Sequence, residues 1–233
     1  MYTTSLLYRT IIAEADHWFE TQVVIAGNTC SQSEIMSVSA DYRMFTENQP
    51  AVGGCLAGEL SVSLLNPAFT IPRMALVEPY VRVTDGTQTS EWIPQGKFYI
   101  DTRETTNNDD DLPILSLHCY DAMLKAEADY PPTTHSWPYA DTAVVQEIAT
   151  TLGVGVDDRT WDLMTQGYEI SLPAGYSMRE VLSNIAGMYA GNWIMNYDGE
   201  LLLVAVNGIP PETNYLVDNI GDAITFGGDR ILV

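Results

Sequence analysis

The clearest pattern of apolar and polar residues lies in the last quarter of the chain, and it predicts a helix followed by a hairpin. Ser177 and Glu180 have the spacing of a capping box, in which a hydroxyl and a carboxylate bind backbone N–H groups at a helix start. Apolar residues then recur along one helical face, and Gly191 is expected to supply the left-handed residue that ends the helix. Asp198 and Gly199 separate two apolar runs, so they predict a tight turn between strands at residues 193–197 and 200–206.

A second helix is expected just before this unit. Asp141 is expected to cap a helix over residues 142–152, whose apolar positions share one face, and Gly153 is expected to end it. A short helical turn and a short strand follow, over residues 159–165 and 168–172. Residues 139–206 therefore read as a small α+β domain of two longer helices on a small sheet.

The first half of the chain has the alternation of half-buried strands. Leu60, Val62 and Leu64 alternate with polar residues, which predicts a strand with one buried face. Residues 80–120 form a series of short β-rich runs with turn residues every ~8 to 12 positions, typical of an antiparallel barrel or sandwich. Residues 6–13 and 18–25 are also β-rich and predict an N-terminal hairpin.

Two boundaries divide the chain into three segments. A short helix at residues 121–126 is expected to close the first domain, residues 1–129, and prolines in residues 130–138 interrupt regular structure. Residues 207–233 follow a Pro-Pro pair and contain two expected short strands, at 214–217 and 223–226. Because this segment stops on an apolar run, we expect the chain to be a piece of a longer protein.

Charge is the extreme feature of the composition. The chain has 233 residues, 46% of them hydrophobic, which suffices for two domains with buried cores. Its 31 acidic and 10 basic residues give a formal net charge of −21 at pH 7. Binding of nucleic acid through phosphates needs clustered lysine and arginine, so this composition argues against it. A strongly acidic surface also keeps a protein soluble. The sequence therefore leaves two interpretations of the charge open, solubility alone or a functional role of the negative surface.

The cysteines and the hydropathy indicate where the chain is made. Cys30, Cys55 and Cys119 are odd in number and lack metal-ligand spacing, which favours buried free thiols in a protein synthesised in a reducing cytoplasm. No stretch approaches the ~20 apolar residues of a membrane span, and the first residues do not resemble a secretion signal. We therefore expect no membrane insertion.

A search for catalytic or ligand-binding patterns yields no predicted site. Asp109, Asp110 and Asp111 are oxygen-rich, as calcium loops are, but the EF-hand spacing is missing, so an exposed acidic loop is favoured. The three histidines lie far apart, and neither a P-loop nor a GxSxG elbow occurs. Two carboxylates that hydrolyse a glycosidic bond are recognised by their separation in space, so the sequence neither identifies nor excludes such a pair. We predict no catalytic, cofactor or metal residues, and no enzyme.

Several stretches resemble phage proteins. Residues 71–75, 79–83, 90–103 and 115–121 resemble tail proteins of prophages in Gram-positive bacteria, and residues 176–180 through 198–201 resemble the inner domain of the phage baseplate hub family. The resemblance implies a tube-type antiparallel β-barrel first, then the α+β domain, with residues 207–233 beginning a second barrel. It implies a structural protein of the virion tail tip, partnered by tail-tube proteins, tail-tip proteins and copies of itself in a trimeric ring that lets DNA pass.

Two other functions remain open from the residues alone. The 5 tryptophans and 13 tyrosines suit stacking on sugars as well as protein interfaces, so a cell-wall carbohydrate-binding module is one alternative. A fragment of a tail-associated peptidoglycan hydrolase is another. For the hub, a carboxylate-lined channel would repel DNA phosphates rather than bind them.

Overall fold

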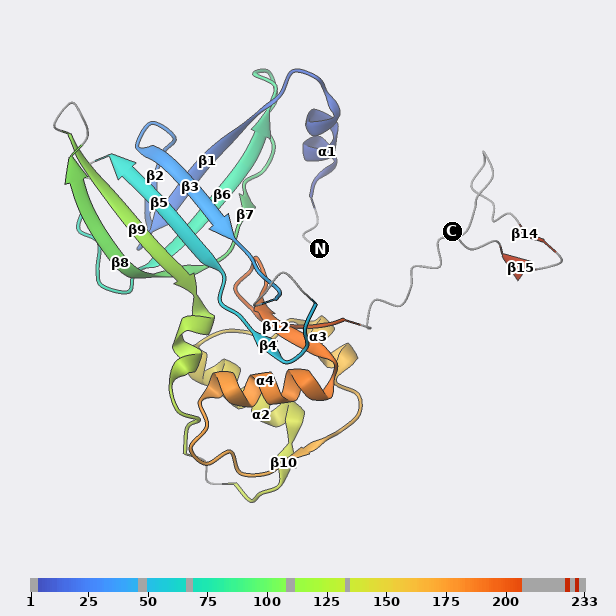
Figure 1. The fold of residues 1–233 in the computed structure, drawn as a ribbon. Coiled ribbons are helices and arrows are strands. Elements are labelled where there is room, and N and C mark those ends of the chain that lie inside the picture. Colours follow the sequence, from blue (N-terminus) through green and yellow to red (C-terminus); the bar gives the residue numbers. More distant parts are fainter. Residues whose placement is uncertain are drawn as a thin grey trace.

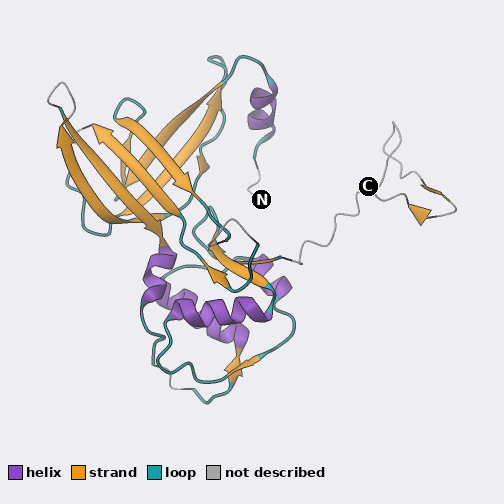
Figure 2. Ribbon diagram, in the orientation of Figure 1, coloured by secondary structure: helices purple, strands orange, loops and turns teal. Residues whose placement is uncertain are grey.

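The computed structural model describes residues 4–45, 50–65, 69–107, 112–132, 135–206, 225–226 and 229–230. Figures 1 and 2 show a large sheet on one side and a compact group of helices with a hairpin on the other. Strands outnumber helices, as the prediction of a mostly β chain with an α+β part requires. The two parts have separate apolar cores.

The large sheet is antiparallel throughout. Its strands are β1 (Trp18–Ile25), β2 (Asn28–Cys30), β3 (Ile35–Asp41), β5 (Glu59–Leu65), β6 (Leu76–Thr84), β7 (Ile93–Pro94), β8 (Phe98–Asn107) and β9 (Pro113–Asp121). They pair in the order β2-β1-β6-β8-β9-β5-β3, with β7 on β6. The predicted meander of residues 80–120 therefore supplies β6 to β9 at the centre of the sheet.

The sheet curves around one apolar core (Figure 1). In β5 the predicted alternation is confirmed, because Leu60, Val62 and Leu64 are at most 1% exposed while Ser61 faces solvent. Phe98 of β8 is fully buried in the same core. Alternate residues of neighbouring strands thus point inward together, as the pleat requires.

The predicted closed barrel is not found among the described strands, since the pairing is an open path from β2 to β3. Four residues join these two edge strands. Glu34 turns back on Ser31, whose N–H and hydroxyl both donate to the Glu34 carboxylate at 2.8 and 2.9 Å. β3 then pairs with β5 and not with β2. This part of the chain is therefore a strongly curved antiparallel sheet.

The N-terminal hairpin predicted from residues 6–13 and 18–25 is wrong in its first half. Leu6–Ala13 form the helix α1, which lies beside β6 (Figure 1). Ser5 caps α1, because its hydroxyl accepts the N–H of Tyr8 at 3.0 Å. Ile11 is the buried residue of this helix. A cap and one buried contact outweigh β-propensity, which depends on context. The actual partner of β1 on this edge is β2.

The second part combines three helices, a 3₁₀ helix and small sheets. Its elements are β4 (Gly54–Cys55), η1 (Ala122–Glu127), β10 (Tyr139–Ala140), α2 (Asp141–Leu152), α3 (Asp158–Leu163), β11 (Glu169–Ile170), α4 (Met178–Met188), β12 (Gly191–Met195) and β13 (Leu201–Ala205). The sheets are β13-β12-β4 and β10-β11. Further along, β14 (Thr225–Phe226) pairs with β15 (Asp229–Arg230).

Trp193 of β12 lies at the centre of the second core. It is fully buried, and its indole Nε1 donates to the Leu182 carbonyl of α4 at 2.8 Å. The apolar faces of α2 and α4, the hairpin and the buried side of η1 close around it. A large aromatic residue with a satisfied N–H is a stable centre for such a core.

A short crossover joins the two parts. β4 lies in the loop between β3 and β5, yet it pairs in parallel with β12 and extends the hairpin sheet. The Asn192 side chain secures it by accepting the Gly54 N–H at 2.6 Å and donating to the Ala51 carbonyl at 2.7 Å. Cys55 belongs to the second core for this reason. A segment from the first half of the chain therefore completes the second part.

Candidate functional site

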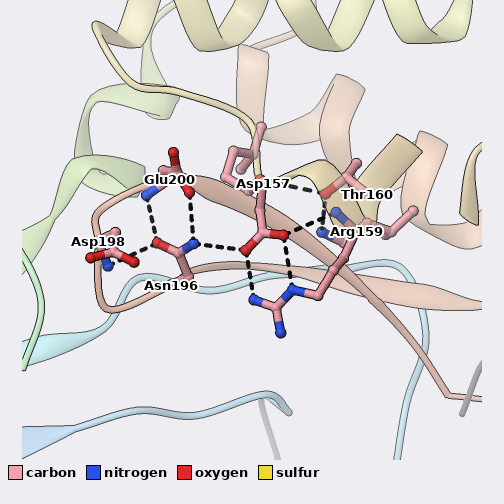
Figure 3. Close-up of polar contacts among 8 residues, drawn as sticks. Asp157, Arg159, Thr160, Asn196, Asp198 and Glu200 are labelled. Carbon is pink, nitrogen blue, oxygen red and sulfur yellow. Dashed lines mark hydrogen bonds and ion pairs between the residues drawn. The ribbon is translucent and has the colours of Figure 1, made fainter. Parts of the chain in front are cut away.

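The most developed polar cluster lies where the start of α3 meets the β12–β13 hairpin (Figure 3). We call it the hairpin network: Asp157, Arg159, Asn196, Asp198 and Glu200. Asp157 is the N-cap of α3, and each of its carboxylate oxygens accepts two hydrogen bonds. Oδ1 takes the Arg159 N–H and Nε, at 3.0 and 2.9 Å, and Oδ2 takes an Arg159 terminal nitrogen and Asn196 Nδ2, at 2.6 and 2.8 Å.

Asn196 fixes the shape of the turn. Its Oδ1 accepts the backbone N–H groups of Asp198 and Glu200, both at 2.9 Å, and its Nδ2 also donates to Glu200 Oε2 at 3.0 Å. Gly199 has the left-handed φ of 74° that the turn needs. The strands end at Met195 and restart at Leu201, so five residues form the connection that was predicted as a tight Asp-Gly turn. The Asn196 backbone also pairs across the turn, since its N–H donates to the Glu200 carbonyl and its carbonyl accepts the Gly199 N–H, both at 2.9 Å.

Thr160 continues this contact into the core. It is fully buried, and its hydroxyl accepts the Leu203 N–H of β13 at 3.1 Å. The N–H of Thr160 itself donates to the Asp157 carbonyl at 2.9 Å (Figure 3). Two side chains therefore hold the start of α3 on the hairpin: Asp157 through Asn196, and Thr160 through the Leu203 N–H.

Electrostatics keep Asp157 and Arg159 ionised. The hydrogen bonds from Arg159 hold the pKa of Asp157 well below its usual range, against the opposing effect of burial, and Asn196 adds to the decrease. The same contact raises the pKa of Arg159. An ionised carboxylate with four donors has little capacity to accept a proton from a substrate. Asp157 is thus a structural group and not a general base.

A cavity of about 420 Å³ opens beside the network. Tyr42, Tyr197 and Leu202 form its apolar walls, and Asp158 and Asp198 contribute carboxylates. The rings of Tyr42 and Tyr197 meet edge to face with centroids 5.4 Å apart, and the Tyr42 hydroxyl donates to the Gln95 carbonyl. Burial raises the pKa of Tyr42, so this phenol stays protonated. The cavity can accept hydrogen bonds from a polar group, and the described residues of its lining include no serine, cysteine or histidine nucleophile.

The residues predicted to shape the α4 hairpin unit are partly where they were expected. Ser177 and Glu180 form the capping box: Ser177 Oγ accepts the Glu180 N–H at 3.2 Å and Glu180 Oε2 accepts the Ser177 N–H at 2.7 Å. Gly191 does not end α4, because the left-handed residue is Ala190, with φ of 49°. Gly191 opens β12, where a Cβ would lie 2.8 Å from the Val204 carbonyl oxygen. A glycine is needed at this position because β12 and β13 approach closely there.

The α2 helix differs from its prediction at one end. Its N-cap is Ala140, and Asp141 is the first helical residue, fully buried. The Asp141 carboxylate accepts the Thr142 N–H at 2.7 Å and the Tyr189 hydroxyl at 2.5 Å, which links α2 to the end of α4. Burial, and then this bond, raise the pKa of Tyr189. Gly153 ends the helix in the left-handed region, with φ of 75°.

The remaining candidates form no common site. Asp109, Asp110 and Asp111 lie outside the described residues. Cys30, Cys55 and Cys119 are buried and unpaired, and burial raises the pKa of Cys55 and of Cys119 to about 12, so both stay protonated thiols. His118 and His135 each approach a different carboxylate, of Glu59 and Glu147. In the described ranges no group of three or more metal-ligating side chains could hold a metal ion.

No helix of the described part is both long and apolar enough to cross a bilayer. The hairpin network itself was missed at the sequence level. Asp157 directly precedes a helix, and an aspartate in that position is a recognisable N-cap. Its partner Asn196 lies 39 residues further on, and nothing local indicates that contact.

Comparison with known proteins gives a result at the level of fold. A scan against protein-family models and a search of curated proteins both find no match. Among solved structures, the chain is similar to the 43 kDa tail protein of prophage MuSo2 from Shewanella oneidensis, with a TM-score of 0.56 and 12% identity over 81% of this chain and 56% of that one. It is also similar to the tail protein from Neisseria meningitidis MC58, with a TM-score of 0.52 and 14% identity over 79% of this chain and 51% of that one.

The chain spans about half the length of both solved structures. Neither comparison supports the Gram-positive origin expected from the sequence. At such low identity the similarity concerns the arrangement of the backbone. Over about four fifths of its length, this chain therefore shares its fold with these two tail proteins, one of which comes from a prophage.

Proposed function

We propose that this protein is a structural component of a phage or prophage tail tip, where it forms part of the baseplate hub between tail tube and tip. The observation that carries the proposal is the similarity of fold to two tail proteins over about four fifths of the chain. Within this proposal, we assign the strongly curved antiparallel sheet to the tube-type domain and the α+β part to the inner domain; two separate apolar cores support a division into two parts. A fold alone is a weaker argument than a site, so assembly has to be measured.

The proposed role is non-enzymatic. Its support is the hairpin network, whose best-placed carboxylate, Asp157, already accepts four hydrogen bonds and stabilises a turn. Two further buried polar side chains hold elements together: Asn192 holds β4, and Thr160 holds β13. Scaffold proteins need such fixed contacts, whereas hydrolases need free acid and base groups.

In the assembled tip, three copies would form a ring, with residues 1–129 as the first tube-type domain, 139–206 as the inner domain and 207–233 as the start of a second tube-type domain. The net charge of −21 supports a carboxylate-rich channel. Such a surface repels the DNA phosphates and so avoids the counterion release that accompanies binding. Tail-tube and tail-tip proteins would be its partners in the virion.

The direct test is localisation in assembled tails. The gene is given an epitope tag in a host that carries the element, tails are purified after induction, and gold-labelled antibody is viewed by electron microscopy. The proposal expects gold at the distal end of the tail in nearly every particle. Label along the whole tube, or protein absent from purified tails, would contradict it.

Assembly of the purified full-length protein gives the second test. Light scattering coupled to size exclusion is expected to report three copies per particle. Turnover of purified peptidoglycan would instead favour the hydrolase alternative, for which no contact in the described residues provides support. An untagged, heat-denatured sample serves as the blank for turnover.

A further inference from the structure

A groove on the outer face of the large sheet has a lining unlike the hairpin network. It encloses about 520 Å³ where β2 stops and β1 continues alone along the edge. We call it the tryptophan groove, after Trp18 and Trp92 in its lining. Trp18, Glu20 and Gln22 of β1 alternate with the residues that face the core, so they point outward together.

Arg82 is the most constrained side chain of the tryptophan groove. Its Nε and a terminal nitrogen donate to Glu20 Oε2 at 2.7 and 2.6 Å, across the β1–β6 register. Its guanidinium carbon lies 4.3 Å from the centroid of the Trp92 ring. One positive and one negative charge therefore cancel within the lining. In a chain of net charge −21, a charge-balanced groove favours an uncharged polar ligand over an ionic one.

Trp18 provides an open aromatic surface. Its residue is 51% exposed, and the indole lies over Gly86: a Cβ there would come within 2.9 Å of the ring. The absence of a side chain at Gly86 thus lets the indole settle against the sheet with its remaining surface free. A large exposed indole beside hydrogen-bonding groups is a suitable platform for the C–H face of a sugar ring.

Two amides complete the lining. Gln32 Oε1 accepts the Thr21 N–H at 3.1 Å, which covers the open edge of β1 and leaves the Gln32 NH₂ group to donate. The Gln22 amide forms no hydrogen bond with any described residue, and it offers both a donor and an acceptor. Hydroxyl groups of a sugar are donors and acceptors at once, so mixed amide chemistry matches them better than a purely acidic lining would.

We propose that the tryptophan groove binds a neutral saccharide, with Trp18 stacking on the ring and Gln22, Gln32 and the Glu20–Arg82 pair binding its hydroxyls. The volume lies within the ~300–1,000 Å³ of small-molecule pockets. The site is independent of the proposed tail role, since saccharide binding and assembly are measured separately. It lies on the sheet, whereas the hairpin network lies in the second part of the fold.

The test uses the full-length chain on an array of neutral oligosaccharides that contains glucose, galactose and N-acetylglucosamine tetramers, with heparin as an anionic control. Calorimetry then measures the affinity for the strongest neutral binder. We expect Trp18→Ala to weaken binding about tenfold, because it removes the platform. Gln22→Ala should weaken it less, by about threefold.

Phe19→Ala is the matched control, since Phe19 is the next residue of β1, is 45% exposed and points to the other face. It should leave the affinity unchanged. Circular dichroism during heating checks that each variant is folded. If Trp18→Ala does not fold, Gln22→Ala still tests the groove. The proposal is overturned if no neutral tetramer binds at about 10 mM, if heparin binds best, or if both groove variants bind as the parent does. It is equally overturned if Trp18→Ala abolishes self-association, because the groove is then a contact between copies.

Discussion

The large sheet and the second part of the fold are stabilised in different ways. We call the second part the helix–hairpin part, after the helices α2 and α4 and the β12–β13 hairpin. In the sheet, the core consists of apolar residues that alternate along neighbouring strands, as Leu60 and Val62 do in β5. In the helix–hairpin part, fully buried polar residues lie beside the apolar core: Asp141 and Thr160 are both 0% exposed, and each has hydrogen-bond partners on another element.

The two cores differ in how strictly they require particular side chains. An alternating apolar face tolerates many combinations of side chains, provided that volume and pattern are kept. A buried polar group requires its one partner, because leaving it unpaired costs about 1–3 kcal/mol. The helix–hairpin part should therefore be the more sensitive to single polar substitutions, and the sheet to loss of volume.

The largest effect is expected from removing the central aromatic residue of each core. Trp193→Ala and Phe98→Ala should each lower the free energy of unfolding by about 3–5 kcal/mol, since both residues are fully buried. Urea unfolding followed by circular dichroism measures this loss. If the crossover at β4 couples the two parts, both variants lower one shared transition; two separate transitions would show that the parts unfold independently.

Trp18→Ala is the control for that pair, since this residue is half exposed. It should change the free energy of unfolding by less than about 1 kcal/mol. A loss for Trp193→Ala no larger than that of the control would contradict the placement of Trp193 at the centre of the second core.

The next effect concerns Asp121, which lies between the two parts and is 3% exposed. Burial raises its pKa from an ordinary 3.8 to about 6, although its carboxylate accepts the Gly58 and Met123 N–H groups at 2.6 and 2.9 Å. Because the folded protein holds this proton more tightly than the unfolded chain, the contribution of Asp121 is full below pH 4 and is lost as the pH rises to about 6. By linkage the loss is about 3 kcal/mol.

Asp121→Asn removes this titration. Urea unfolding at pH 4 and pH 7 should therefore show a smaller decrease in stability for the variant than for the parent protein. The exposed Asp101→Asn, on β8, is the matched control and should keep the parental difference. Equal pH differences for the parent and for Asp121→Asn would mean that Asp121 titrates normally.

A smaller effect is expected at the crossover. Asn192→Ala leaves the Gly54 N–H and the Ala51 carbonyl without their partner, which should cost about 2 kcal/mol. Asn28→Ala in the exposed edge strand β2 is the control, because its amide hydrogen bonds are long, at 3.4 Å, and it should cost less than about 0.5 kcal/mol. Hydrogen exchange of the Gly54 amide provides a local measurement, and unchanged protection in Asn192→Ala would contradict the bridging role.

The smallest effect should come from the ion pair of the hairpin network. The side chains of Arg159 and Asp157 are 53% and 10% exposed, so solvent screens their attraction and Arg159→Ala should cost less than about 1 kcal/mol. Raising the salt concentration should reduce this cost further. Arg43→Ala removes a more exposed pair with Asp41 and serves as the control, with no measurable cost expected. A loss of Arg159→Ala that is large and independent of salt would indicate a packing role instead.

Local patterns of the sequence predicted much of this structure, and the failures have identifiable causes. The alternation of β5 and the Ser177–Glu180 capping box depend on neighbouring residues, so both are visible in the sequence. For residues 6–13, β-propensity and helix capping competed, and the cap at Ser5 decided the outcome. Barrel closure was a further prediction, and closure depends on which strand each edge meets, which no local pattern encodes.

The candidate site was less accessible from the sequence. Asp157 and Asn196 come from different elements, and their contact is created by the packing of α3 on the hairpin. The left-handed residue after α4 is another example: glycine was expected there, but Ala190 takes that conformation because Gly191 is required where two strands approach closely. The limits of the domains stay a prediction.

The parallel pairing of β4 with β12 has a consequence for biosynthesis. Gly54 leaves the ribosome 138 residues before Asn192, the side chain that binds it. At ~5–20 residues per second, the emerging polypeptide waits about 7–30 s for this partner, while the strands of the large sheet become available in between. During translation the sheet can therefore mature first, and the helix–hairpin part acquires its last strand from a segment that was made long before.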